Sequence, residues 1–200
     1  MTYTPVKTLT VEDFLTQYIG DPRYELIDGE LRNLEPTGPH ESVAGTLAGH
    51  RFSALSLEKK AWIIPKNCLI QPPATQATVL RPDVILLDRE KLSQEPLWSR
   101  EPIISSGQAI VAGAEVVSSN WQDDYARQIE EYRFLGIQEY WIVDFKGLGG
   151  IAFIGKPKQP TLTIFQLKSD EYVEKQYRLH EPIESKVFSQ LKLTLNDLMP

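Results

Sequence analysis

Two carboxylates stand inside short apolar runs of this chain. Asp83 lies within residues 79–87 and Glu115 within residues 110–117, and both runs are predicted to be core strands. Because burial raises the cost of a carboxylate charge, an acid at such a position is expected to be paired, protonated or bound to a cation. Two such acids together suggest a metal site. The alternative is a surface acid or an ion pair, since Arg81 lies two residues before Asp83 on the same predicted strand face.

The supply of other metal ligands limits which ion could bind. The 200 residues include three histidines and one cysteine, which cannot assemble a thiolate or multi-histidine zinc site. A metal here would therefore have oxygen ligands and would be magnesium, manganese or calcium. The single cysteine, Cys68, has no partner for a disulfide and is predicted to be a core thiol.

A predicted helix follows Glu115 and carries one polar residue on its inward face. With successive residues about 100° apart, an apolar stripe is formed by Trp121, Tyr125, Tyr132 and Leu135. Gln128 lies in the middle of this stripe, and Asp124 borders it. A buried glutamine needs hydrogen-bond partners, and the carboxylates of the strands beneath are the expected ones; a core glutamine bonded to backbone is the alternative.

Arg127, next to Gln128, is predicted to point away from the strands. It lies about 100° from Gln128 around the helix, and Asp123 and Glu131 are its i−4 and i+4 neighbours. This spacing is typical of an ion-pair ladder on the solvent side of a helix.

A short helix and a hairpin are predicted near the N-terminus. Thr10 and Asp13 form an acidic variant of the capping box, which places a helix at residues 9–18. The pair Asp28-Gly29 is among the best sequences for a two-residue hairpin turn. The strands that it joins are residues 24–27 and 30–34, and Glu25 lies on the first of them.

A longer helix is predicted at residues 39–57, with Pro39 in its first turn. His40 falls in the same turn, where it is either an ordinary surface residue or a group that points at substrate. Strands follow at residues 61–70 and 79–87, separated by a loop with two prolines at residues 72–76. Residues 88–107 form an irregular excursion around Trp98, which could pack as a cover or as an oligomer contact. The sequence therefore leaves open whether the chain forms a homodimer.

The C-terminal part is predicted to form a meander of antiparallel strands. Its strands are residues 151–154, 162–167 and 171–179, and residues 191–199 are apolar enough to fold back on the core. The chain contains no repeat, low-complexity tract or linker. Residues 1–200 are therefore expected to form one mixed α/β (α+β) domain.

Composition excludes some functions. No segment resembles a secretory signal or a membrane span, so the expected location is cytoplasmic. The formal charge of −6 argues against strong nonspecific nucleic-acid binding, which depends on Lys and Arg. Short basic clusters remain, and such clusters are usually solvated faces. They are Lys59, Lys60 and Lys66, and Lys156 and Lys158.

Several motifs resemble the Uma-two (Uma2) family of putative restriction endonucleases, a branch of the PD-(D/E)XK nuclease superfamily. They are Arg81-Pro82-Asp83, Glu115-Val116-Val117-Ser118, the Tyr-rich helix that leads to Glu139-Tyr-Trp-Ile-Val-Asp144, and Tyr24 to Leu31 with His40. The resemblance covers most of the chain. It implies a restriction endonuclease-like fold, a mixed sheet flanked by helices.

The resemblance also implies roles for residues. Asp83 and Glu115 would bind Mg²⁺ or Mn²⁺ at neighbouring strand positions, with the main-chain carbonyl of Val116 as a further ligand. Glu25 would be an additional carboxylate at the edge of the site, and His40 and Asp124 would contact the substrate. The ion would activate water and stabilise charge on a scissile phosphodiester.

The superfamily expects a lysine two residues after the glutamate, and this chain has Val117 there. The resemblance to the Uma-two family implies that the lysine lies instead on the following helix, at the position that Gln128 occupies in this chain. Glutamine can donate a hydrogen bond but brings no charge, which could lower the rate by two or three orders of magnitude. Arg127 points elsewhere and is a poor substitute.

Three hypotheses follow. The first is a metal-dependent nuclease that hydrolyses DNA, with Asp83 and Glu115 holding the ion and Gln128 placing water or phosphate. The second is a weakened or inactive relative that binds nucleic acid or a protein. A sugar hydrolase with a carboxylate pair is disfavoured, because no cluster of exposed aromatics accompanies the acids.

Overall fold

The computed structural model describes residues 8–34, 36–58, 61–73, 77–119 and 121–200, with residues 52 and 55–58 described by their backbone alone. The basic residues Lys59 and Lys60, and part of the predicted loop at residues 72–76, lie outside these ranges. Nothing in the described ranges is a helix both long and apolar enough to cross a membrane.

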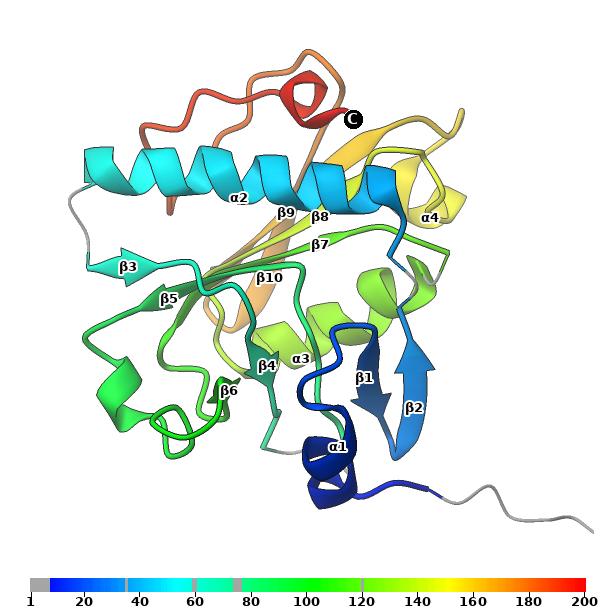
Figure 1. Ribbon diagram of the computed structural model, residues 1–200. Coiled ribbons are helices and arrows are strands. Elements are labelled where there is room, and N and C mark those ends of the chain that lie inside the picture. The colour runs from blue at the N-terminus through cyan, green and yellow to red at the C-terminus, as the bar shows by residue number, and fades with distance from the viewer. Residues whose placement is uncertain (1–7, 35, 59–60, 74–76, 120) are drawn as a thin grey trace, which may run out of the picture.

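A six-stranded mixed sheet is the centre of the described part of the chain (Figure 1). Its strand order is β10-β9-β8-β7-β5-β3. The strands are β3 (Trp62–Ile63), β5 (Val84–Asp88), β7 (Ile110–Val116), β8 (Glu139–Asp144), β9 (Thr161–Lys168) and β10 (Glu171–Tyr177). β7 and β8 are parallel, and the other neighbours are antiparallel. The predicted mixed α+β fold is confirmed.

Helices cover both faces of this sheet (Figure 1). α2 (Gly38–Glu58) crosses one face, where its residue Leu47 shares a core cluster with Val84 of β5. α3 (Gln128–Phe134) lies on the opposite face, where Tyr132 shares a cluster with Ile85. Successive side chains of β5 therefore enter two different cores, as the pleat of a strand requires.

The N-terminal predictions hold. α1 (Val11–Tyr18) begins after Thr10, whose side chain accepts the Asp13 amide in the predicted capping box. β1 (Tyr24–Ile27) and β2 (Glu30–Asn33) pair across Asp28 and Gly29. Both turn residues have positive φ, 51° and 80°, as the primed hairpin turn demands.

The two strands predicted at residues 61–70 and 79–87 are interrupted. β3 ends at Ile63, and β4 (Leu69–Ile70) leaves the main sheet to pair with β6 (Ile103–Ile104). Val79 and Leu80 bridge Leu26 and Ile70 rather than continuing into β5. Pro82 has no amide hydrogen for a strand ladder, so β5 starts only at Val84.

The C-terminal meander is confirmed in β9 and β10, but residues 151–154 form the short helix α4 (Ile151–Ile154) instead of a strand. Gly150 in extended conformation begins that helix and Gly155 with φ 79° ends it. The chain end folds back on the α2 side of the sheet as expected, through η3 (Leu195–Leu198) and its buried leucines. In the excursion at 88–107, which also contains η1 (Leu92–Gln94), Trp98 packs on the core as a cover.

Candidate active site

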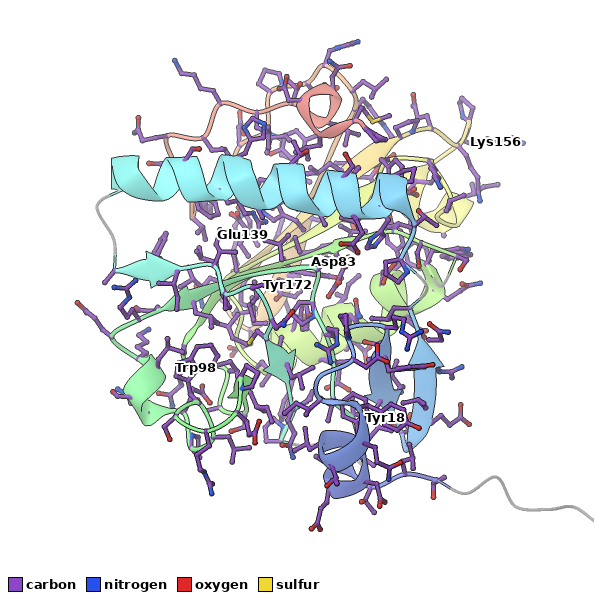
Figure 2. All side chains as sticks on the ribbon, in the orientation of Figure 1. Tyr18, Asp83, Trp98, Glu139, Lys156 and Tyr172 are labelled. Carbon is purple, nitrogen blue, oxygen red and sulfur yellow. The ribbon has the colours of Figure 1, made fainter. Side chains whose placement is uncertain are left out.

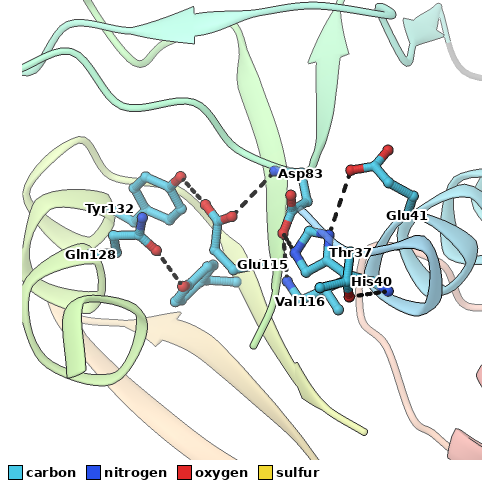
Figure 3. Close-up of polar contacts among 9 residues, drawn as sticks. Thr37, His40, Glu41, Asp83, Glu115, Val116, Gln128 and Tyr132 are labelled. Carbon is cyan, nitrogen blue, oxygen red and sulfur yellow. Dashed lines mark hydrogen bonds and ion pairs between the residues drawn. The ribbon is translucent and has the colours of Figure 1, made fainter. Parts of the chain in front are cut away.

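Asp83 and Glu115 face each other across two adjacent strands. β5 and β7 pair Val84 with Ala114, so the next position places Asp83 opposite Glu115. The Asp83 amide donates to Oε2 of Glu115 at 3.2 Å, and the Val116 amide donates to Oδ2 of Asp83 at 2.7 Å (Figure 3). The Asp83 carboxylate is therefore held by an amide of β7, and the Glu115 carboxylate by the amide of Asp83 just before β5.

Asp83 lies at the entrance of β5 and not inside a strand. Figure 2 shows it between α2 and α3, with its side chain 20% exposed. The predicted alternative partner, Arg81, is directed elsewhere: its guanidinium donates to the carbonyls of Tyr24 and Ile19 at 3.1 and 3.3 Å. The ionic partner of Asp83 is instead His40.

His40 is buried at the start of α2, so the expectation of an ordinary surface residue is wrong. Its Nε2 lies 3.3 Å from Oδ2 of Asp83, and its Nδ1 lies 3.6 Å from Glu41 (Figure 3). Burial lowers the pKa of His40, but the hydrogen bond and charge of Asp83, together with Glu41 and the Val116 carbonyl, outweigh it and raise that pKa.

Glu115 is buried in β7, as predicted, with 4% exposure. Tyr132 of α3 donates its hydroxyl to Oε1 of Glu115 at 2.7 Å. Burial raises the pKa of Glu115 well above its ordinary value, and the nearby charges of Asp83 and Asp124 raise it further. Glu115 is therefore more stable when it is protonated or bound to a cation than as a free carboxylate.

A π-helical turn, η2 (Asp123–Arg127), precedes α3. In a π-helix the hydrogen bond joins residues five apart, and the Gln128 amide donates to the Asp123 carbonyl. Asp123, Asp124 and Gln128 consequently line the same pocket. In a regular α-helix Asp123 would lie about 140° from Gln128, which is why the sequence placed it on the solvent side.

The predicted ion-pair ladder around Arg127 is confirmed in its Glu131 member, and a longer-range contact is added to it. Its guanidinium binds both carboxylate oxygens of Asp28 in the hairpin turn, one of them at 2.7 Å, and is 3.8 Å from Glu131. Arg127 does not line the pocket that holds the acids, in agreement with its predicted direction.

Two further acids have perturbed protonation. Glu25 is buried, and burial with the charges of Asp123 and Asp83 raises its pKa to about 7. Burial and the charges of Asp83 and Glu25 raise the pKa of Asp124 well above its ordinary value. Oδ2 of Asp124 is buried and has no hydrogen-bond partner among the described residues.

Gln128 is buried with 4% exposure, so its inward direction is confirmed. Its Oε1 accepts a hydrogen bond from the Tyr140 hydroxyl at 3.2 Å, and the same hydroxyl lies 3.3 Å from the Asp124 carbonyl. The contact identified for Gln128 is thus a tyrosine, where a carboxylate or a backbone group was expected.

These groups line one pocket of about 140 Å³, which we call the acidic pocket. Its charged residues are Glu25, His40, Glu41, Lys66, Arg81, Asp83, Glu115, Asp123 and Asp124, and Gln128 also lines it. The pocket brings together all of the site residues predicted from the sequence, with Val116 in its wall. The sequence did not single out Asp123 or Lys66 for it, and Cys68, predicted as a core thiol, is buried in its wall.

The donor set fits a hard divalent cation. The acids supply only oxygen, and one buried oxygen of Asp124 lacks a partner among the described residues. Burial, and after it the charges of neighbouring acids, raise the pKa values of Glu25, Glu115 and Asp124. In the described ranges, no three His, Cys, Asp or Glu side chains converge as a preformed metal cluster. Mg²⁺ commonly uses one or two carboxylates and keeps several waters, so the Asp83 and Glu115 pair suffices for it.

Comparison with known proteins identifies the family and the fold. A family model described as "Uma2: Putative restriction endonuclease" matches residues 11–196. The crystal structure of a putative nuclease belonging to DUF820 from Anabaena variabilis ATCC 29413 has a similar fold, with a TM-score of 0.69, 16% identity and 97% of each chain covered. No curated protein matches. Because the family model spans nearly all of the sequence, the chain belongs to the Uma2 family of putative restriction endonucleases.

Proposed function

We propose that this protein is a divalent-metal-dependent nuclease that hydrolyses phosphodiester bonds of DNA. The observation that supports the proposal is the pairing of Asp83 and Glu115 across β5 and β7, within a pocket of buried acids. In it Asp83, Glu115 and the Val116 carbonyl would hold Mg²⁺ or Mn²⁺, and Glu25 would add a carboxylate at the edge. Such an ion lowers the pKa of bound water and neutralises charge on phosphate.

The protein groups around this pair have separate tasks in the proposal. His40 holds Asp83 in place through its 3.3 Å contact, from a position beside the incoming substrate. The unpartnered oxygen of Asp124 can accept a hydrogen bond from water or substrate. Gln128 can donate its amide to water or phosphate but cannot supply positive charge.

Cleavage of plasmid DNA with Mg²⁺ or Mn²⁺ tests the proposal. Wild type should cut, Asp83→Ala should abolish cutting, and Glu174→Ala, which removes an exposed acid of β10, should have no effect. Calorimetric titration of the metal should show binding to wild type and its loss in Glu115→Ala. Cutting that survives Asp83→Ala would overturn the proposal.

A second candidate function is binding of nucleic acid without efficient cleavage. It is supported by the neutral side chain of Gln128 at the position where a lysine is expected. The described lysine and arginine of the acidic pocket do not take over that position. Arg81 is bound to carbonyls of the N-terminal region, and Lys66 is exposed. Loss of one positioned charge in a water-poor site lowers a rate by roughly two to three orders of magnitude.

Gln128→Lys distinguishes the two functions. If the site lacks only its cation, this variant should raise cleavage by about a hundredfold. Gln122→Lys is the matched control, since it adds the same charge at an exposed position just before η2. No gain in Gln128→Lys, combined with wild-type DNA binding and no cleavage, supports the binding function.

A further inference from the structure

A second hollow opens beside the acidic pocket, and we call it the Trp121 hollow. It has a volume of about 430 Å³ and is lined by Thr37, His40, Val117, Ser118, Ser119, Trp121, Phe145, Lys146 and Leu148. His40 and Ser118 line the acidic pocket as well. The two spaces therefore adjoin at His40, the residue that contacts Asp83.

The Trp121 hollow is positively charged, whereas the neighbouring acidic pocket is negatively charged. None of its lining residues, all of them described, is acidic, and Lys146 is exposed at its wall. Lys158 lies next to it, with Nζ 2.9 Å from the Leu148 carbonyl and 6.0 Å from the centre of the Trp121 ring. In a chain of net charge −6, these lysines make the hollow suited to an anion.

Trp121 is held in a fixed position at this wall. The half-buried indole packs edge-on against Phe153, with ring centres 6.1 Å apart. A Cβ at Gly150 would lie 3.0 Å from the indole, so the glycine permits this close approach. Asp144 fixes the adjoining loop by accepting the amides of Leu148 and Gly149 at 2.9 and 2.7 Å.

We propose that the Trp121 hollow binds an unpaired nucleotide of single-stranded DNA next to the phosphate that enters the acidic pocket. The base would stack on Trp121, and its phosphate would meet Lys146. A base inside a duplex already has both faces stacked, so an aromatic wall of this kind selects unpaired nucleotides. The inference rests on the proposed function and adds a substrate class to it.

Binding without metal tests this inference independently of cleavage. A short fluorescein-labelled oligothymidylate is titrated with the protein in EDTA, and anisotropy gives the dissociation constant. Trp121→Leu should weaken binding about tenfold, because stacking on an aromatic side chain contributes about 1–3 kcal/mol per base. Trp121→Phe keeps an aromatic face and should retain most of the affinity.

The lysine is tested by salt dependence. Lys146→Ala should reduce the slope of log affinity against log salt by about 0.7, the value for one phosphate contact on a single strand. Lys168→Ala is the matched control. Lys168 is exposed at the end of β9 remote from Asp144, which pairs with Thr161 at the other end, so its loss should leave binding unchanged.

A measurement on the wild-type protein covers the case in which Trp121→Leu does not fold. Photo-crosslinking of a bromouracil oligonucleotide to wild type should label the peptide that contains Trp121. Equal affinity for a duplex, crosslinks confined to other peptides, or no binding by wild type overturns the inference. Binding through Trp121 without any cleavage supports the inference and overturns the nuclease proposal. Cleavage with binding that does not depend on Trp121 supports the nuclease proposal and overturns the inference.

Discussion

Tyr132 of α3 donates its hydroxyl to Glu115 of β7 at 2.7 Å, and both residues are buried. This bond joins the helix that carries Gln128 to the strand that carries the candidate metal ligand. It also satisfies one carboxylate oxygen, Oε1, while the Asp83 amide satisfies Oε2. The helix and the strand pair are therefore positioned by the same carboxylate.

Tyr132→Phe is predicted to weaken both stability and metal binding. Removal of the hydroxyl leaves a buried oxygen of Glu115 without its donor, which should lower the free energy of unfolding by about 1–3 kcal/mol. Ionised Glu115 becomes less favourable, so metal affinity should fall too. Urea denaturation and calorimetry measure the two effects.

Tyr172→Phe is the control for this prediction. Tyr172 also donates its hydroxyl to a single acceptor, the Ile137 carbonyl at 2.9 Å, but does not line the acidic pocket. Its loss should affect stability and leave metal affinity unchanged. Equal metal affinity in wild type and Tyr132→Phe would contradict the role assigned to the bond.

Glu25→Gln is predicted to stabilise the protein at alkaline pH. The pKa of Glu25 is raised from 4.5 to about 7 in the folded state. Below about pH 4.5 both states bind the proton; between about pH 4.5 and 7 the unfolded state releases it while the folded state keeps it, and above about pH 7 the folded state too must ionise a buried acid. Wild type therefore loses up to about 3 kcal/mol over this window, and the neutral variant does not.

Denaturant titrations at pH 4.5 and pH 8 measure this difference. Glu25→Gln and wild type should be equally stable at the lower pH, and the variant should be more stable at the higher one. Glu30→Gln, at an exposed position on β2, should show no comparable change between the two conditions. A stability difference that is independent of pH would show that the carboxylate charge is not its cause.

Much of this site was accessible from the sequence, because its determinants are local. The apolar runs predicted core strands around Asp83 and Glu115, the family resemblance implied that the two acids are neighbours, and helical spacing turned Gln128 inward. The π-turn was not predictable, since it is a departure from the period on which the prediction depends. The Arg127 contact with Asp28 joins residues 99 apart in the chain, and no local pattern encodes such a pair.

The interruption at Arg81 to Asp83 is a different kind of failure. The apolar residues on both sides of Arg81-Pro82-Asp83 have the composition of one continuous strand. Pro82 was the residue that indicated an interruption of this strand. His40 likewise could not be assigned a partner from its place in a first helical turn. Its burial depends on where α2 crosses the sheet, which is a tertiary property.

Divalent metal is predicted to stabilise the protein in a pH-dependent way. At pH 8, Mg²⁺ or Mn²⁺ at a hundred times its dissociation constant should add about 2.7 kcal/mol to the free energy of unfolding. At pH 5 the effect should be smaller, because the raised pKa values of Glu115 and Asp124 make protons compete with the metal for these acids as pH falls. Thermal denaturation with metal or EDTA measures this, with Asp83→Asn expected to abolish the shift and Glu174→Gln to retain it.

Gly107 and Gly136 form a matched pair for testing how the helix α3 is anchored. Both have positive φ, 75° and 72°, so alanine at either position should cost about 1–2 kcal/mol of backbone strain. At Gly107 the added Cβ would also lie 2.6 Å from the Leu135 carbonyl oxygen, whereas at Gly136 nothing lies within 4 Å. Gly107→Ala should therefore destabilise the protein more than Gly136→Ala in urea denaturation, and equal losses would mean that the end of α3 can move away from the 88–107 excursion at no cost.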